Sequence, residues 1–333
     1  MYADRQTVHP PAVATDEADS GTEPLVPETS LGTQLRHGAL VVAVDGTAEG
    51  AGPVLVAEAL QRRFGSDVLA VQVMDLSGVP LPTPLPSMFT LARDLIGDAP
   101  YAEDARARRR QFSDWIGLPN EWTVHVALGT PASEILRYAE QRRAALIVLG
   151  LRRHGIVDRV LRDETTLTVA RRARGAVLGV AGTMHGLPRT AVVGVDFGPA
   201  SIRAARAALD LLATPTPDEP ASLRLVYVDR AGSGIGEKTD GETVIERLGV
   251  AAAFDQLVAE LHPPAGVGIE CVERQGDPAK ELLTYAGDAR ADLIAVGSLR
   301  HERIERWVLG SVTTEVVRDG RCSVLVIPPL PVS

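Results

Sequence analysis

The segment from Gly129 to Gly150, GTPASEILRYAEQRRAALIVLG, is repeated from Gly276 to Gly297 as GDPAKELLTYAGDARADLIAVG. The two segments align without a gap and share Gly, Pro, Ala, Glu, Leu, Tyr, Ala and the final Gly at matching positions. Self-similarity of this kind indicates that the chain contains two copies of one structural unit.

The repeat continues in both directions from this segment. Upstream, GALVVAVDGT in the first half matches RTAVVGVDFG in the second, and each is an apolar run that ends in Val-Asp. Downstream, GAVLGVAG matches CSVLVIPP. Each half therefore begins and ends with a segment that is typical of a buried strand.

The second half alternates between strand patterns and helix patterns. A helix is expected to start at Asp277 as N-cap with Pro278 in its first turn, and another to be capped by Ser311 and to end at Gly320. A long helix is expected over residues 241–261. The expected strands are residues 191–195, 222–229, 268–276, 291–297 and 323–329.

Strands that alternate with helices in this way predict parallel sheets covered by helices on both faces. The predicted fold class is α/β, with two tandem, doubly wound, five-stranded parallel-sheet domains. The expected organisation is a disordered tail over residues 1–36, a first domain over 37–184 and a second over 188–333. In such folds ligands bind beyond the carboxyl ends of the strands, where the strand order reverses.

Composition excludes several classes of function. With 333 residues, a net charge of -9 and a pI near 5.4, the chain as a whole does not suit nucleic acid or anionic membranes. Its basic run at Ala105–Gln111 has no interleaved aromatic residues that would stack on bases. No apolar run approaches the roughly 18 residues of a membrane helix, and the tail does not resemble a signal peptide. We therefore expect a cytoplasmic protein.

The remaining chemistry-bearing residues show no catalytic or metal-binding pattern. The two cysteines, Cys271 and Cys322, form no CxxC pair, and the seven histidines have no metal-ligand spacing. Ser311 has no sequence sign of an activating base. No catalytic residue and no metal site is predicted.

The residues quoted above resemble a known family. Each half is similar to a universal stress protein (UspA) domain, whose fold is like that of the adenine nucleotide alpha hydrolases, and the whole chain resembles a tandem member. Members that bind ATP carry an aspartate after the first strand and the pattern G-x2-G-x9-G-[ST] after the fourth. In the second half these positions, with the residue whose backbone would meet adenine, are Asp196, Val228, Gly297, Arg300, Gly310 and Ser311. Arg300 departs from the pattern, because it stands where the family has its second glycine.

General chemistry agrees with what this resemblance implies. The first amides of a helix at Gly310 and Ser311 are suited to phosphate, and glycine allows a close approach to the backbone. The Asp196 carboxylate can accept a hydrogen bond from a ribose hydroxyl, although an aspartate at this position is also commonly a helix cap. Arg300 either pairs with phosphate or blocks the site. His301 and Arg303 would add positive charge.

The first half departs further from the family pattern. Gly150 is kept, but Arg153, Asp163 and Glu164 replace the following glycines and serine. Two carboxylates at a helix start would repel a triphosphate. Asp45 remains at the end of the first strand, yet an Asp-Gly pair is also a common turn.

Three functions are considered. In the first, the protein is a stress-response module that senses ATP or another adenine nucleotide, with or without Mg²⁺, in its second domain, and that signals to an unidentified protein partner. In the second, it is a tandem scaffold that binds no nucleotide and acts through protein contacts. In the third, it is a slow ATP hydrolase, for which Glu302 or Glu315 would have to assist. The resemblance also implies pairing, either as a homodimer or as a pseudo-dimer of the two domains.

Overall fold

The computed structural model describes most of both repeats. It covers residues 30–44, 51–74, 117–119, 121–151, 159–216, 218–230, 249–298 and 309–329, with the backbone alone for residues 74 and 159–164. Within these ranges, no helix combines the length and the apolar character that a membrane crossing requires.

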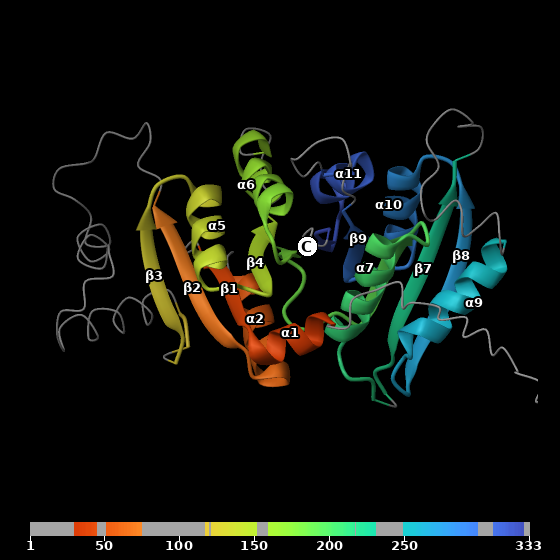
Figure 1. Ribbon diagram of the computed structural model, residues 1–333, viewed down its shortest axis with the longest axis horizontal. Coiled ribbons are helices and arrows are strands. Elements are labelled where there is room, and N and C mark those ends of the chain that lie inside the picture. The colour runs from red at the N-terminus through yellow and green to blue at the C-terminus, as the bar shows by residue number, and fades with distance from the viewer. Residues whose placement is uncertain are drawn as a thin grey trace, which may run out of the picture.

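Within the described residues each half contributes five strands, most of which are labelled in Figure 1. In the first half they are β1 (Ala39–Val44), β2 (Asp67–Met74), β3 (Thr123–Leu128), β4 (Leu146–Leu151) and β5 (Ala176–Ala181). In the second half they are β6 (Thr190–Val195), β7 (Ala221–Asp229), β8 (Val267–Gln275), β9 (Leu293–Gly297) and β10 (Ser323–Ile327).

The described helices follow the same repeat. The first half has α1 (Leu31–His37), α2 (Ala51–Phe64), α5 (Pro131–Gln141) and α6 (Arg159–Arg172). The second half has α7 (Pro199–Leu211), α9 (Val250–Leu261), α10 (Pro278–Asp288) and α11 (Ser311–Asp319).

The strand order confirms the predicted fold and adds one feature to it. The order is β3-β2-β1-β4-β5 in the first half and β8-β7-β6-β9-β10 in the second, and the strands within each half are parallel. The last strands of the two halves, β5 and β10, pair with each other in antiparallel fashion, so the two sheets form one ten-stranded sheet. The domains are therefore joined edge to edge.

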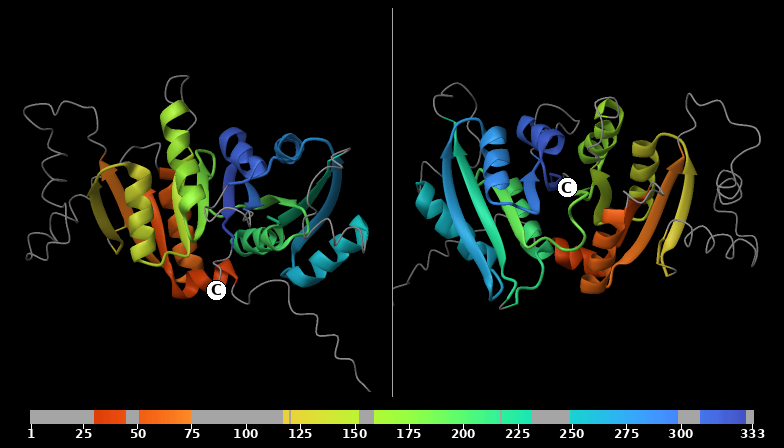
Figure 2. Two further views of the ribbon diagram at one scale, coloured as in Figure 1. Left: turned by 45° about the horizontal axis from the view of Figure 1, so that its top comes forward. Right: turned by 180° about the vertical axis from the view of Figure 1, so that it is seen from behind.

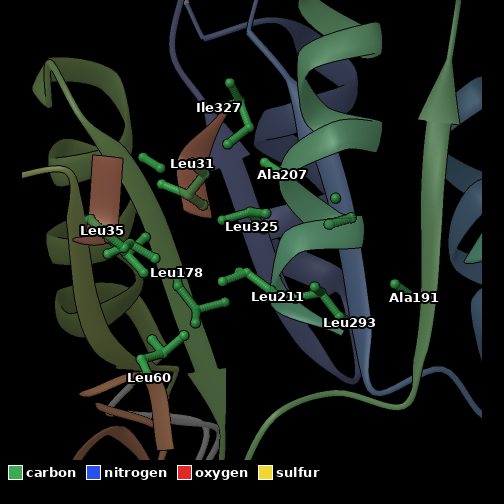
Figure 3. Packing of buried hydrophobic residues seen from close by; sticks show 14 of the residues in the cluster. Leu31, Leu35, Leu60, Leu178, Ala191, Ala207, Leu211, Leu293, Leu325 and Ile327 are labelled. Atoms are coloured by element: carbon green, nitrogen blue, oxygen red, sulfur yellow. The ribbon is translucent and has the colours of Figure 1, made fainter. Parts of the chain in front are cut away.

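Helices cover both faces of this sheet (Figures 1 and 2). The core on one face is completed by α1, α2, α7 and α9, and the core on the other by α5, α6, α10 and α11. At the join, Leu178 of β5 and Leu325 of β10 are almost fully buried and lie beside leucines of α1, α2 and α7 (Figure 3). Both apolar cores contain residues of the two halves and thus run across the boundary between the domains.

Some predicted helix ends are confirmed and others are wrong. Asp277 does cap α10, accepting a hydrogen bond from the Lys280 amide at 3.0 Å, and α11 does end at Gly320. The N-cap of α11, however, is Gly310, and Ser311 is the first helical residue. The described part of the predicted long helix, α9, begins only after Gly249, whose φ of 79° is incompatible with a continuous helix.

Two further expectations need correction. Residues 31–36, predicted to belong to a disordered tail, lie in α1, because Leu31 and Leu35 are spaced to bury one face of a helix in the core. Residues 1–29 lie outside the described residues. In addition, Asp163 and Glu164 are not at a helix start, because α6 begins at Arg159 and places them beyond its first turn.

Candidate functional site

Asp196 lies directly after β6, where the chain turns into α7. Its Oδ1 atom accepts hydrogen bonds from the Gly198 amide at 3.0 Å and from the Ser201 hydroxyl at 2.6 Å. One carboxylate oxygen therefore stabilises the turn into α7, but Asp196 is not the cap considered for it, because the N-cap of α7 is Gly198 and no side chain caps that helix. Among the described residues no hydrogen bond to Oδ2 is seen, which leaves this oxygen for a ligand hydroxyl.

The fold brings three of the predicted residues to one edge of the second sheet. Strand β6 lies between β7 and β9, so Asp196, Val228 and Gly297 all stand at the carboxyl ends of adjacent parallel strands. The strand order reverses between β6 and β9, which is the position where doubly wound sheets bind ligands. The predicted location of the site is thus consistent with the topology.

Gly297 has a structural reason to be glycine. A Cβ atom at this position would lie 2.4 Å from the Ala200 carbonyl oxygen and 2.9 Å from the Ala200 Cβ. The backbone that approaches Gly297 therefore belongs to α7 of the same domain. The Gly297 carbonyl also accepts a hydrogen bond from the Thr313 hydroxyl at 3.3 Å, which ties β9 to the first turn of α11.

The start of α11 is open in a way that suits an anion. Its N-cap, Gly310, has no side chain to accept hydrogen bonds from the first amides, and a Cβ there would meet no described atom within 4 Å. Ser311 is exposed. Uncapped amides at a helix start carry partial positive charge and bind phosphate or carboxylate groups.

A hollow of about 300 Å³ adjoins this helix start. Ser311 contributes to its lining, as do residues that the sequence did not single out as nucleotide contacts. The lining residues are Arg230, Gly276, Asp277, Pro278, Ala279, Ser311, Val312 and Glu315. Arg230 supplies positive charge, whereas Asp277 and Glu315 are acidic, and Asp277 is already engaged as the cap of α10.

Thr313 could have been suspected from the repeat, whereas Arg230 could not, because its counterpart after β2 is Asp75. Thr313 follows the predicted Gly-Ser pair, and its counterpart in the aligned first half, Thr166, is also a buried threonine. Arg230 stands two residues after Val228, at the end of β7. Arg300, His301 and Arg303 lie outside the described residues, as does Asp45 of the first half.

The corresponding region of the first half is built differently. Here β4 continues through Gly150 to Leu151, which is buried, while β9 ends at the glycine itself. A Cβ at Gly179 would lie 2.7 Å from the Leu151 Cγ, so the leucine occupies space that this glycine leaves free. A Cβ at Gly150, by contrast, would have only the Pro53 Cγ nearby, at 3.6 Å. Among the described residues, no group of acidic, histidine or cysteine side chains is arranged to hold a metal.

Comparison with known proteins gives the class to which this fold and this site belong. The universal stress protein family matches residues 38–180 and 188–328, so the chain belongs to that family and contains two tandem domains. Universal stress protein MJ0531 of Methanocaldococcus jannaschii is 28% identical over 139 residues, covering 41% of this chain and 79% of that protein.

Solved structures support the same arrangement over most of the chain. A universal stress protein from Archaeoglobus fulgidus is 16% identical, with a TM-score of 0.57, and covers 89% of this chain and 99% of that one. Protein PA1789 of Pseudomonas aeruginosa is 14% identical, with a TM-score of 0.57, and the match covers 89% of this chain and 94% of that one. A single-domain structure similar to 42% of this chain, at 24% identity and a TM-score of 0.30, is a universal stress protein in complex with cAMP.

Proposed function

We propose that the second domain binds an adenine nucleotide, with ATP as the leading candidate, and that the protein is a nucleotide-sensing module of the stress response. The observation that carries the proposal is the open start of α11, where Gly310 and Ser311 present uncapped amides beside a hollow of about 300 Å³. Asp196, at the neighbouring strand end, keeps one carboxylate oxygen without a described partner.

Each residue of this site has a distinct role in the proposal. The first amides of α11 and the Ser311 hydroxyl bind phosphate, while Asp196 accepts a hydrogen bond from a ribose hydroxyl. The backbone at Val228 meets the adenine ring. Gly297 acts indirectly, since its contact with Ala200 fixes the distance between β9 and α7. Mg²⁺, if required, would reach the site with the nucleotide, because divalent cations usually accompany the phosphates.

The test is calorimetric titration of ATP with Mg²⁺ into the wild type and two variants of the N-cap, Gly310→Asp and Gly310→Asn. A Cβ at position 310 would meet no atom of the described residues within 4 Å, and both residue types are favoured N-caps, so both variants should fold at least as well as the wild type. They differ in charge. A carboxylate about 4 Å from a phosphate costs up to about 4 kcal/mol at an effective dielectric constant of about 20.

We expect Gly310→Asp to weaken ATP binding by more than about tenfold relative to Gly310→Asn. Equal affinities for the two variants would show that phosphate does not bind at α11. A wild type that binds neither ATP nor cAMP would overturn the proposal and favour the tandem scaffold. In the same experiment, weaker binding by Arg300→Gly would make Arg300 a phosphate ligand, and tighter binding would make it a block.

A further inference from the structure

The last turns of α5 and α6 and the residues that follow them carry a concentration of positive charge. These residues, called the basic edge below, are Arg142, Arg143, Arg171, Arg172 and Arg174, and all five are exposed. Because α5 leads into β4 and α6 into β5, both helix ends lie at the edge of the first sheet where the strands begin. Because β5 and β10 are antiparallel, the start of β5 lies beside the end of β10, which in turn pairs with Gly297 at the end of β9. The basic edge is therefore on the same side of the joined sheet as the proposed nucleotide site of the second domain.

The five arginines lie close together. The Arg174 Nη2 atom is 2.9 Å from the Glu140 Oε1 atom, which joins the residue after α6 to the last turn of α5. Arg142 approaches Asp67 at 4.0 Å. Among the described residues, Arg143, Arg171 and Arg172 have no ion-pair partner. The two acidic neighbours therefore leave a net positive surface.

The second half provides an internal comparison, because it contains the same two helices at matching positions. Seven positions at and after the ends of α5 and α6 are compared, namely 141–143, 145, 171, 172 and 174. Their counterparts at and after the ends of α10 and α11 hold three arginines and three aspartates, a net charge of zero. In the first half the same positions hold five arginines and no acidic residue, a net charge of +5. The acidic set in the second half is Asp288, Asp292 and Asp319.

Stability does not account for this difference. Cations in a last helical turn complement the helix dipole, but this explains Arg171 and Arg172 only, and α11 forms with Arg318 and Asp319 in their place. Exposed ion pairs such as Arg174–Glu140 contribute little, about 0–1 kcal/mol. The structure therefore gives the first half a charged surface that its fold does not require.

We propose that the basic edge is a docking surface for a short acidic segment of a partner protein. Arginine suits this role, since its planar guanidinium pairs with carboxylates in bidentate fashion, and Asp67 and Glu140 already place carboxylates on the surface. The net charge of the whole chain, -9, opposes long polyanions such as nucleic acid. A short segment experiences mainly the local field, because charges more than about 8 Å away are screened at physiological salt.

The test measures the fluorescence anisotropy of a labelled peptide of about ten glutamates, titrated with the full chain at low and at physiological salt. The variant is Arg142→Ala/Arg172→Asp, which places in the first half the residue types found at the matching positions of the second. The matched control, Arg290→Ala/Arg318→Ala, removes two exposed arginines from the second half.

We expect the wild type to bind the peptide more tightly at low salt, the first variant to lose at least about tenfold in affinity and the control to lose less than about twofold. Circular dichroism and urea denaturation midpoints close to that of the wild type would show that both variants fold. The proposal is overturned if the wild type does not bind the peptide at low salt, if both variants lose affinity equally, or if duplex DNA of matched charge binds more tightly than the peptide.

Discussion

At the scale of single residues, Gly297 shows how close packing within the domain can resemble a ligand site in the sequence. Its missing side chain leaves room for the Ala200 carbonyl at the start of α7, 2.4 Å from where a Cβ would lie. We expect Gly297→Ala to destabilise the protein by about 1–3 kcal/mol, because backbone atoms must shift to relieve the overlap. Gly150→Ala, at the matching position of the first half, has its nearest atom at 3.6 Å and should be close to neutral.

Urea denaturation of the two variants against the wild type measures this difference. If Gly150→Ala is as destabilising as Gly297→Ala, the contact with Ala200 is not the cause. The sequence was sufficient to predict that Gly297 lies at the end of its strand, since the repeat and the family pattern both mark that position. It could not show that the approaching group belongs to α7, because that contact depends on the distance between two elements.

At the scale of elements, the two halves place their large and small side chains on opposite members of a strand pair. The pair is β4 and β5 in the first half and β9 and β10 in the second. The buried pair Leu151 and Gly179 in the first half corresponds to Ser298 and Val326 in the second, both also buried. A large residue on one strand is thus matched by a small one on the next. This packing arrangement is absent from the family pattern and became visible only in the structure.

Gly179→Val alone should destabilise the protein by about 1–3 kcal/mol, because its side chain would overlap Leu151 at 2.7 Å. Adding Leu151→Ser, which completes the arrangement of the second half, should recover most of that loss even though Leu151→Ser alone leaves a cavity. A double-mutant cycle of unfolding free energies measures the coupling. Simple additivity of the two changes would rule out this packing explanation.

Local signals in the sequence predicted some elements well and others poorly. The start of α10 was predictable because Asp277 and Pro278 act through neighbouring backbone atoms. The start of α6 was not, because α6 begins at Arg159, more than one turn before Glu164, the residue that aligns with the start of α11. Helix α1 was missed since its seven residues have little helical tendency alone, and its stability comes from burying Leu31 and Leu35 against the rest of the molecule.

At the scale of the whole molecule, the pairing of β5 with β10 could not be read from the sequence. Both are short apolar strands, and either could have remained an edge or paired with a second copy of the chain. Their pairing is reinforced by α1, which lies against α7 of the other half and whose leucines share its core (Figure 3). The contact between α1 and α7 includes a partly buried acidic group, Asp210.

Asp210 links the halves through its Oδ2 atom, which accepts a hydrogen bond from the Gly32 amide at 2.8 Å. Burial raises the pKa of its carboxyl above the usual value, although the bond from Gly32, the Ser30 hydroxyl and the charges of Arg63 and Arg206 act in the opposite direction. The folded state therefore keeps this proton at pH values where the unfolded state has lost it. The resulting stability is fully present below the unfolded pKa and is lost as pH rises through the folded pKa.

Asp210→Asn removes this titration while keeping an oxygen that can accept the Gly32 hydrogen bond. We therefore expect the unfolding free energy of the wild type minus that of Asp210→Asn to fall as pH rises above about 4, and to become constant above the raised pKa. Urea denaturation at a series of pH values measures this difference, and the exposed Asp288→Asn provides the control. A difference that rises with pH would mean that Arg63 and Arg206 outweigh burial, in which case the contact between α1 and α7 is held by charge attraction and should weaken with added salt.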